Sequence, residues 1–361
     1  MRNIFCLLLF TITFICLDSK AQDSTCYYQQ AYEIIDSMLT GKTQLNFKNA
    51  VLTTENAYLD GQLDYVKING ELEVLARLVK AISATNFLTY NETDKYIVQK
   101  QASIFKVLTD TIPIFIDSTH IFLHLSYTYD FVDNWGQNDW TKMFVSKLLV
   151  AGNGNCHSLP YLYKILAEEF QVPAYLSFAP NHIYIKSHCK KTGWYNTELT
   201  SATFPVDAWI MASGYVPLEA IRNGLYMDTL SLKQSVAYSL LDLAQGFKKK
   251  FGNSNPDFVV KCCKTVLNYH PSNVNAMLTK AEAQKQFIDS KMKEKYVNKP
   301  DELFEDKSIK AIYLDMEQTY VQLHQLGYRR MPKEMYLKWM GMLKNESKEY
   351  FDKKVIVKFK N

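Results

Sequence analysis

Apolar residues recur at helical spacing along most of the chain, and one central stretch alternates as strands do. Before about residue 130, Leu72, Leu75 and Val79 mark one buried face of a predicted helix. Residues 174–179, 182–186 and 194–200 follow a period of two instead, which predicts short strands. Helical spacing returns after about residue 215. The pattern therefore predicts an α+β chain in which helices flank a small antiparallel sheet.

A predicted helix comes directly before the strands, with a cysteine at its start. Gly152 and Gly154 are expected to adopt positive φ, and Asn155 is a good N-cap. Pro160 moves the expected start of the regular helix to a residue or two after Cys156. Helical spacing places one buried face at Leu159, Leu162, Tyr163, Leu166 and Phe170.

The predicted hairpin carries a histidine on one strand and polar residues on the next. His182 shares a face with Tyr184 and Lys186. A polar turn follows at residues 190–193, and the returning strand has Asn196 and Glu198 on one face. An imidazole and its possible partners are therefore expected on neighbouring strands.

These residue types suit nucleophilic catalysis by a thiol. A helix N-terminus lowers the pKa of a cysteine, and the thiolate is the nucleophile, which makes Cys156 the candidate nucleophile. His182 would be the general base, held in its tautomer by Glu198. Asn196 lies one strand period away and could orient the ring instead. The adjacent His157 would point about 100° away from Cys156 on a helix, so we discount it as the base.

The segments GNCHSLP, NHIYIK and GWYNTELT resemble the transglutaminase-like superfamily of papain-type cysteine enzymes, especially exported bacterial members with helical repeats after the core. The resemblance implies that Cys156, His182 and the acid form a catalytic triad. The family's acid is usually Asp, whereas Glu198 occupies the matching position here. The family also contains non-catalytic scaffolds, so the fold alone does not establish activity.

Composition and motifs exclude several other functions. The formal net charge is +4, and the longest basic run, Lys248–Lys250, is typical of the end of a helix rather than of a nucleic-acid site. The sequence has no metal-ligand spacing, phosphate loop or dinucleotide fingerprint, so we expect no cofactor or metal. A peptide or protein substrate fits the predicted thiol chemistry.

The N-terminus has the pattern of an export signal. Arg2 precedes an apolar stretch that is too short to span a membrane, and cleavage is expected before Gln22. We expect no later membrane span and a periplasmic or extracellular protein. Five of the seven cysteines would remain, and an odd count leaves at least one thiol free, for which Cys156 is the candidate.

The C-terminal helical pattern resembles a tetratricopeptide repeat, with a helix ending near Pro271 and a second from Ala276 to Phe287. We expect a signal peptide at 1–21, a helical N-terminal region at 22–130, a transglutaminase-like core at 131–215 and a helical, tetratricopeptide-like region at 216–361. The favoured function is a thiol-dependent hydrolase or acyl transferase acting on an amide bond. The alternative is a catalytically inactive binding or scaffold module that holds a protein partner on its helical repeats.

Overall fold

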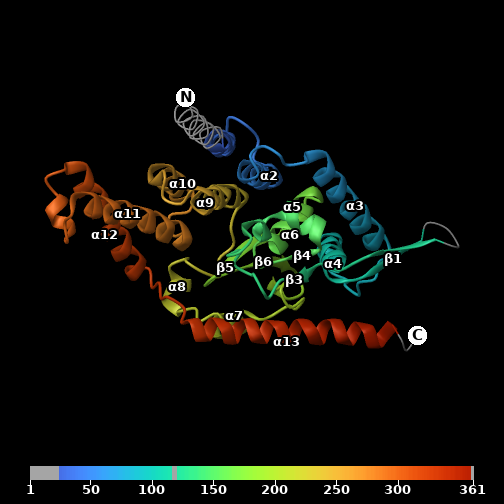
Figure 1. The fold of residues 1–361 in the computed structure, drawn as a ribbon. Coiled ribbons are helices and arrows are strands. Elements are labelled where there is room, and N and C mark those ends of the chain that lie inside the picture. The colour runs from blue at the N-terminus through green and yellow to red at the C-terminus, as the bar shows by residue number, and fades with distance from the viewer. Residues whose placement is uncertain (1–23, 116–119, 359–361) are drawn as a thin grey trace, which may run out of the picture. The chain divides into compact units, whose positions relative to one another are not determined.

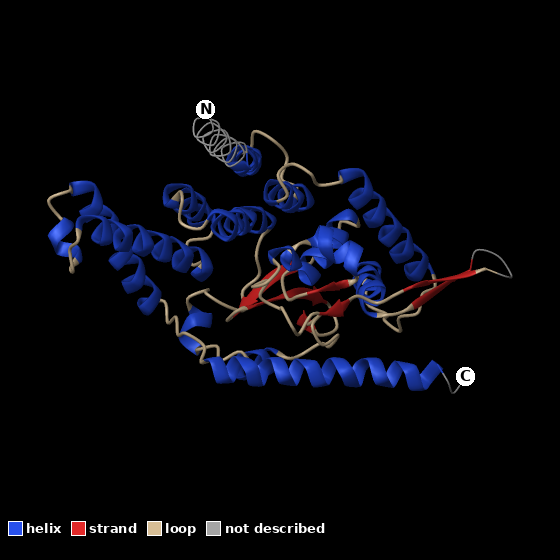
Figure 2. Ribbon diagram, in the orientation of Figure 1, coloured by secondary structure: helices blue, strands red, loops and turns tan. Residues whose placement is uncertain are grey.

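The computed structural model describes residues 24–115 and 120–358 (Figure 1). The fold is α+β, with many helices and small sheets, as the sequence predicts (Figure 2). The signal peptide predicted at residues 1–21 lies outside the described residues. Within the described part of the chain, no helix is long and apolar enough to cross a membrane.

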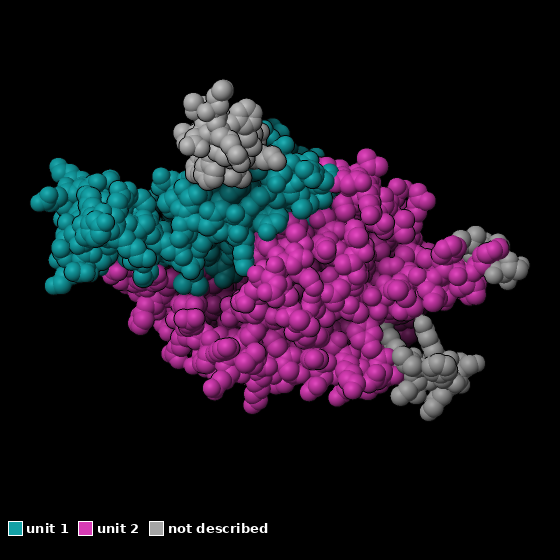
Figure 3. Space-filling model, viewed as in Figure 1, with its two compact units in different colours: residues 1–63, 236–271, 275–316 teal, residues 64–235, 272–274, 317–361 magenta. Residues whose placement is uncertain are grey.

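The chain forms two compact units that are discontinuous in sequence (Figure 3). Of the described residues, unit 1 contains 24–63, 236–271 and 275–316, and unit 2 contains 64–115, 120–235, 272–274 and 317–358. The sequence suggested consecutive regions instead, because hydrophobic spacing indicates which face of an element is buried but not which distant element covers it.

Unit 1 is helical. Residues 24–39 form its first helix, followed by α2 (Phe47–Tyr58) and, after a long excursion of the chain, by most of α9 (Leu232–Phe251). Tyr28 packs edge-on against the rings of Phe247 and Phe251, with centroid distances of 5.2 and 5.6 Å. These aromatic contacts join the N-terminal helix to α9.

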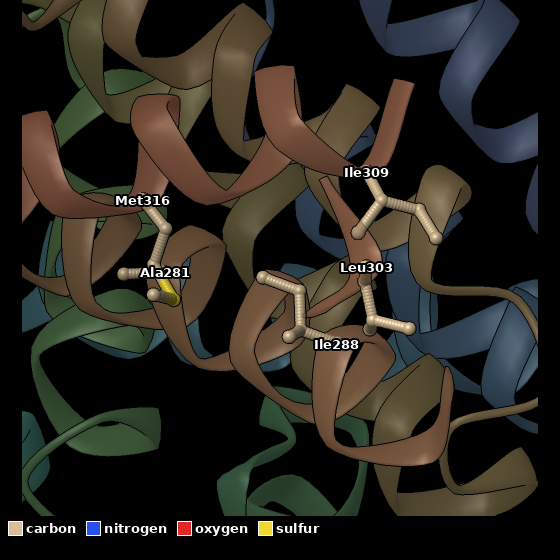
Figure 4. Packing of buried hydrophobic residues seen from close by; sticks show 5 residues of the cluster. All are labelled: Ala281, Ile288, Leu303, Ile309 and Met316. Atoms are coloured by element: carbon tan, nitrogen blue, oxygen red, sulfur yellow. The ribbon is translucent and has the colours of Figure 1, made fainter. Parts of the chain in front are cut away.

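The remaining helices of unit 1 include the predicted helix pair. They are α10 (Pro256–Tyr269), α11 (Val274–Lys295), the short η2 (Pro300–Leu303) and the first part of α12 (Lys307–Gln325). The turn between α10 and α11 falls where the sequence indicated, and the tetratricopeptide relationship stays a prediction. Figure 4 shows the apolar cluster that joins α11, η2 and α12, formed by Ala281, Ile288, Leu303, Ile309 and Met316.

Unit 2 begins with α3 (Tyr65–Ala84) and α4 (Lys95–Thr109) and then departs from the helical pattern expected up to residue 130. Three strands occur there instead: β1 (Ile112–Phe115), β2 (Ile121–His124) and β3 (Thr128–Tyr129). β1 and β2 form an antiparallel pair. Pro113 and the β-branched residues around it favour extended backbone, which explains why this stretch is not helical.

The centre of unit 2 is a helix on a three-stranded sheet. The chain passes through η1 (Trp140–Met143), α5 (Val145–Ala151), β4 (Asn153–Gly154) and α6 (Ser158–Glu169). It then forms β5 (Tyr175–Ala179), β6 (His182–Cys189) and β7 (Gly193–Thr197), which pair antiparallel in the order β5-β6-β7. The predicted buried residues of α6 are buried, since Leu159, Leu162, Tyr163 and Leu166 are all at most 2% exposed, but the helix is buried on its other sides as well, from Ser158 to Ala167.

Three further helices complete unit 2: α7 (Asp207–Ser213), α8 (Leu218–Arg222) and the long α13 (Lys333–Lys358). Helix α13 returns from the far end of the sequence to pack on this unit, where Tyr350 Oη lies 3.1 Å from Thr109 Oγ1. Its side chains Trp339 and Leu343 are fully buried. The C-terminal helix is therefore part of the same core as the sheet.

Candidate active site

The loop that carries Cys156 is held by glycine packing and by a buried asparagine. Gly152 ends α5 with φ of +66°, as the sequence predicts. Gly154 does not have positive φ, which corrects the sequence prediction. Its role is close packing, because an added Cβ would lie 2.5 Å from Ser158 Oγ and 2.8 Å from Leu148 Cδ1. Any side chain at Gly154 would therefore force Ser158 or Leu148 to shift.

Asn155 caps the turn that leads into α6. Its Oδ1 accepts the backbone N–H groups of His157 and Ser158, each at 3.0 Å, and Ser158 Oγ accepts the N–H of Asn155 at 3.1 Å. This reciprocal arrangement resembles a capping box. Cys156 lies within this turn, two residues before the first residue of α6. The expected delay of the regular helix past Cys156 is confirmed.

The Cys156 side chain is a free thiol and is partly exposed. Its Sγ lies 4.0 Å from the carbonyl oxygen of Asn181, the residue before His182. Asn181 has φ of +59° and, together with Pro180, forms the tight turn between β5 and β6. This turn brings the first residue of β6 beside the start of α6.

His182 and Glu198 form a buried ion pair on neighbouring strands. Nε2 of His182 lies 2.5 Å from Oε2 of Glu198, and the two residues are 3% and 2% exposed. The other carboxylate oxygen, Oε1, accepts the backbone N–H of Thr200 at 2.8 Å. Glu198 therefore holds the imidazole with one oxygen while the backbone holds the other.

The remaining imidazole nitrogen, Nδ1, is also buried. Nδ1 of His182 makes no hydrogen bond of ordinary geometry among the described residues. The imidazole also interacts with the Cys156 side chain, which raises the pKa of His182 and lowers that of the thiol. Nucleophile and base often approach loosely in an unliganded cysteine enzyme and tighten when substrate binds.

The electrostatics of the three residues favour a thiolate–imidazolium pair. Burial lowers the pKa of His182, but the charge of Glu198 and the hydrogen bonds with Cys156 and Glu198 outweigh it and raise the pKa to about 10. Burial raises the pKa of the Cys156 thiol, but the interactions with His182 and Tyr129 outweigh it and lower the pKa. Burial likewise raises the pKa of Glu198, and His182 outweighs it, so the carboxyl stays ionised.

The sheet register explains why Glu198, and not Asn196, meets His182. Asn196 lies opposite Lys186. Lys186 is four residues along β6 from His182, a separation of about 13 Å. Instead, Nδ2 of Asn196 donates to Asp207 Oδ1 at 2.8 Å. Glu198, just beyond the end of β7, is diagonal to His182 and within its reach.

The adjacent His157 is directed elsewhere, as the sequence suggested. Its Nδ1 lies 2.9 Å from the carbonyl oxygen of Met143, and its ring packs on Tyr161 at a centroid distance of 4.0 Å. His157 therefore positions the loop and does not compete with His182 for the thiol.

Helix α13 supplies aromatic residues to the site that the sequence reasoning missed. The Trp339 ring meets the imidazole of His182 edge-on, with a centroid distance of 4.9 Å. Tyr336 accepts a hydrogen bond from Nδ2 of Asn134 at 2.7 Å, and its ring packs on Trp135. Burial and the nearby Cys156 charge both raise the pKa of Tyr336. Trp339 and Tyr336 lie far from Cys156 in sequence, so no local spacing pattern could identify them.

Tyr129 is a second residue that the sequence reasoning missed. β3 and β4 pair in parallel, with Tyr129 opposite Gly154, two residues before Cys156. This pairing brings the Tyr129 hydroxyl to the thiol, where it contributes to the lowered pKa of Cys156. The strands β3 and β4 that position Tyr129 are only two residues long each. They are too short to leave a recognisable strand pattern in the sequence.

A separate cavity of about 620 Å³ lies between α4, α6 and β7. Its wall includes Phe105, Tyr163, Tyr195, Phe204 and Asn196, but not Cys156, His182 or Glu198. Asn196, the alternative third member of the triad in the sequence analysis, therefore belongs to the wall of this cavity rather than to the thiol site.

Comparisons with known proteins give no further assignment. No protein-family model matches the chain, and neither a curated protein nor a solved structure matches it. The chemistry of the site is therefore argued from its own geometry.

Proposed function

We propose that unit 2 is a thiol-dependent hydrolase or acyl transferase that acts on an amide bond of a peptide or protein. Cys156 is the nucleophile, His182 the general base and then acid, and Glu198 the residue that orients His182. The observation that carries the proposal is the buried His182–Glu198 pair at 2.5 Å, beside a Cys156 thiol whose Sγ lies 4.0 Å from the carbonyl oxygen of the residue before His182.

The first half of the reaction transfers the acyl group to sulfur. The thiolate of Cys156 attacks the carbonyl carbon, a C–S bond forms, and the carbonyl π electrons move to oxygen. The protonated Nδ1 of His182 then gives its proton to the leaving nitrogen as the C–N bond breaks. The products of this half are a free amine and a thioester on Cys156.

The second half releases the acyl group. Water, or a second amine in a transferase, attacks the thioester carbon while Nδ1 of His182 takes its proton. The C–S bond breaks and the thiolate returns. Glu198 keeps the Nε2–H of His182 in place throughout and stabilises the imidazolium. Trp339 shields one edge of the imidazole, which strengthens the electrostatic interaction by excluding water.

The acyl-enzyme can be trapped with an activated ester. We expect p-nitrophenyl acetate to give a burst of p-nitrophenolate and one acetyl group on the peptide that contains Cys156, removable by hydroxylamine as a thioester is. The Cys156→Ala and His182→Asn variants should lose the burst. Cys189→Ala is the matched control, because Cys189 is a buried thiol outside the triad, and it should keep the burst.

Acetylation of Cys156 no faster than acetylation of the exposed Cys26 would contradict the proposal. That result would favour the alternative, a catalytically inactive module that binds a protein partner through the helices of unit 1.

A further inference from the structure

One buried hydroxyl lies beside the thiol and interacts with it. Tyr129 is 8% exposed, and its hydroxyl oxygen has no partner of ordinary hydrogen-bond geometry among the described residues. Buried polar groups are nearly always hydrogen-bonded, because leaving one without a partner is costly. An unsatisfied donor at a reaction centre therefore calls for a functional explanation.

The backbone fixes the position of this hydroxyl. Tyr129 pairs with Gly154, and the N–H of the next residue, Asp130, donates to the Gly154 carbonyl at 2.7 Å. The Tyr129 ring also packs on Phe131, with a centroid distance of 4.6 Å. The tyrosine is thus paired with the same short segment that carries Cys156.

The Tyr129 hydroxyl keeps its proton and remains a hydrogen-bond donor. Burial and the nearby Cys156 charge both raise its pKa well above the ordinary value for tyrosine, so it stays protonated at neutral pH. It therefore cannot serve as a general base. In the resting protein, the negative charge available to this donor is the thiolate of Cys156.

We propose that Tyr129 is a catalytic residue that donates its O–H to the oxyanion of the tetrahedral intermediate. The inference rests on the proposed function, since it assigns a second role at the same site. When the thiolate attacks, its charge moves from sulfur to the carbonyl oxygen, two bonds away. The hydroxyl follows the charge by rotating about the C–O bond of the phenol. Among the described residues, no other hydrogen bond of ordinary geometry restricts this rotation.

Two probes of different chemistry separate this role from a simple effect on the thiol. Alkylation by iodoacetamide forms a C–S bond, expels iodide and creates no oxyanion, so its rate reports the thiolate alone. Acylation by p-nitrophenyl acetate forms the C–S bond, places charge on the carbonyl oxygen and then expels p-nitrophenolate. The ratio of the acylation rate to the alkylation rate therefore isolates the stabilisation of the oxyanion.

The test is the Tyr129→Phe variant, which keeps the ring and removes the hydroxyl. We expect the acylation rate of Cys156 to fall about 100-fold, the scale for losing one oxyanion donor. The alkylation rate at the same pH should fall much less, by about 10-fold or less, because the thiolate keeps its imidazolium partner.

The control is Tyr28→Phe. Tyr28 is 1% exposed and its hydroxyl also lacks a partner among the described residues, but it lies in unit 1 and packs on Phe247. Both rates should be unchanged in this variant.

Equal losses of acylation and alkylation in Tyr129→Phe would overturn the inference and leave Tyr129 with an effect on the thiol alone, and no loss in either rate would overturn it as well. A wild-type Cys156 that reacts with neither probe faster than Cys26 would instead overturn the proposed function. The two failures are therefore distinguishable.

Discussion

The sharpest perturbation of the site is Glu198→Gln, which keeps the size of the side chain and removes its charge. The two carboxylate oxygens of Glu198 accept from two donors, Nε2–H of His182 and the N–H of Thr200. The two donors face different oxygens of Glu198, and an amide replaces one of these oxygens with an NH₂ group, which cannot accept. Either the Thr200 N–H loses its acceptor, or the amide NH₂ faces His182 and the imidazole must change its tautomer.

The size of the effect follows from the pKa of His182. In the intact site it is raised from 6.5 to about 10. Since one pH unit corresponds to about 1.4 kcal/mol, the protonated ring is favoured by roughly 5 kcal/mol, shared between Glu198 and Cys156. With glutamine, burial is no longer offset by the Glu198 charge. In a Cys156→Ala background, which removes the thiolate, we expect the pKa of His182 to stay above 6.5 while Glu198 is present and to fall below 6.5 when Glu198→Gln is added.

The assay is an NMR titration of the His182 ring in Cys156→Ala and in Cys156→Ala with Glu198→Gln. The His182 signal is assigned by its loss in His182→Asn. Asn196→Ala is the matched control, because Asn196 bonds to Asp207 and lies away from His182. It should change the His182 pKa less than Glu198→Gln does. A larger change in Asn196→Ala, or no change in Glu198→Gln, would refute the assignment of Glu198.

The same variants predict a pH-dependent stability. Because the folded pKa of His182 is raised, its contribution is full below the unfolded value of about 6.5 and disappears as the pH rises through the folded value. Because the folded pKa of Glu198 is lowered, its contribution is present above its unfolded value and disappears as the pH falls through the folded value. In the Cys156→Ala background, Glu198→Gln should therefore cost most near pH 5–6, about 3 kcal/mol, the low end for breaking a buried pair.

Two further variants test the framework of the site. Asn155→Ala removes the acceptor for two N–H groups at the Cys156 turn and should lower stability by about 1–2 kcal/mol in urea unfolding while slowing Cys156 alkylation. Asn46→Ala, at the cap of α2 in unit 1, should have a similar cost without any change in alkylation. Trp339→Ala should lower the free energy of unfolding by about 3–5 kcal/mol, because the indole is only 1% exposed. Leu337→Ala is its control, at a 57% exposed position of the same helix, and should change the free energy of unfolding by about 0.5 kcal/mol or less. Equal costs for Trp339→Ala and Leu337→Ala would contradict the packing of α13 on His182.

Local patterns predicted the parts of the site that are close in sequence. The buried face of α6, the strands around His182 and the start of the helix after Cys156 depend on residues within one turn or one strand period of each other. Glu198 and Asn196 could not be separated in this way, because alternation gives both the same face. Their separation required the register, in which Asn196 lies opposite Lys186.

Contacts between distant segments could not be read from the pattern. Trp339 meets His182 across more than a hundred residues of sequence, and the apolar positions of its helix do not identify the element that they contact. Tyr129 depends on a two-residue ladder. The discontinuous units could not be predicted for the same reason, since a buried face in the sequence does not identify the element that covers it.

The pH dependence of Cys156 alkylation tests the activated thiol most directly. Peptide mapping after a short exposure to iodoacetamide measures each cysteine separately, including Cys189, whose pKa is lowered because hydrogen bonds from Thr192 and Tyr90 outweigh its burial. We predict that at pH 6 Cys156 reacts faster than the other described cysteines and faster than a model thiol with a pKa of about 8.5, and that His182→Ala removes the advantage. Alkylation of Cys156 at the rate of the model thiol, with no change in His182→Ala, would contradict the account.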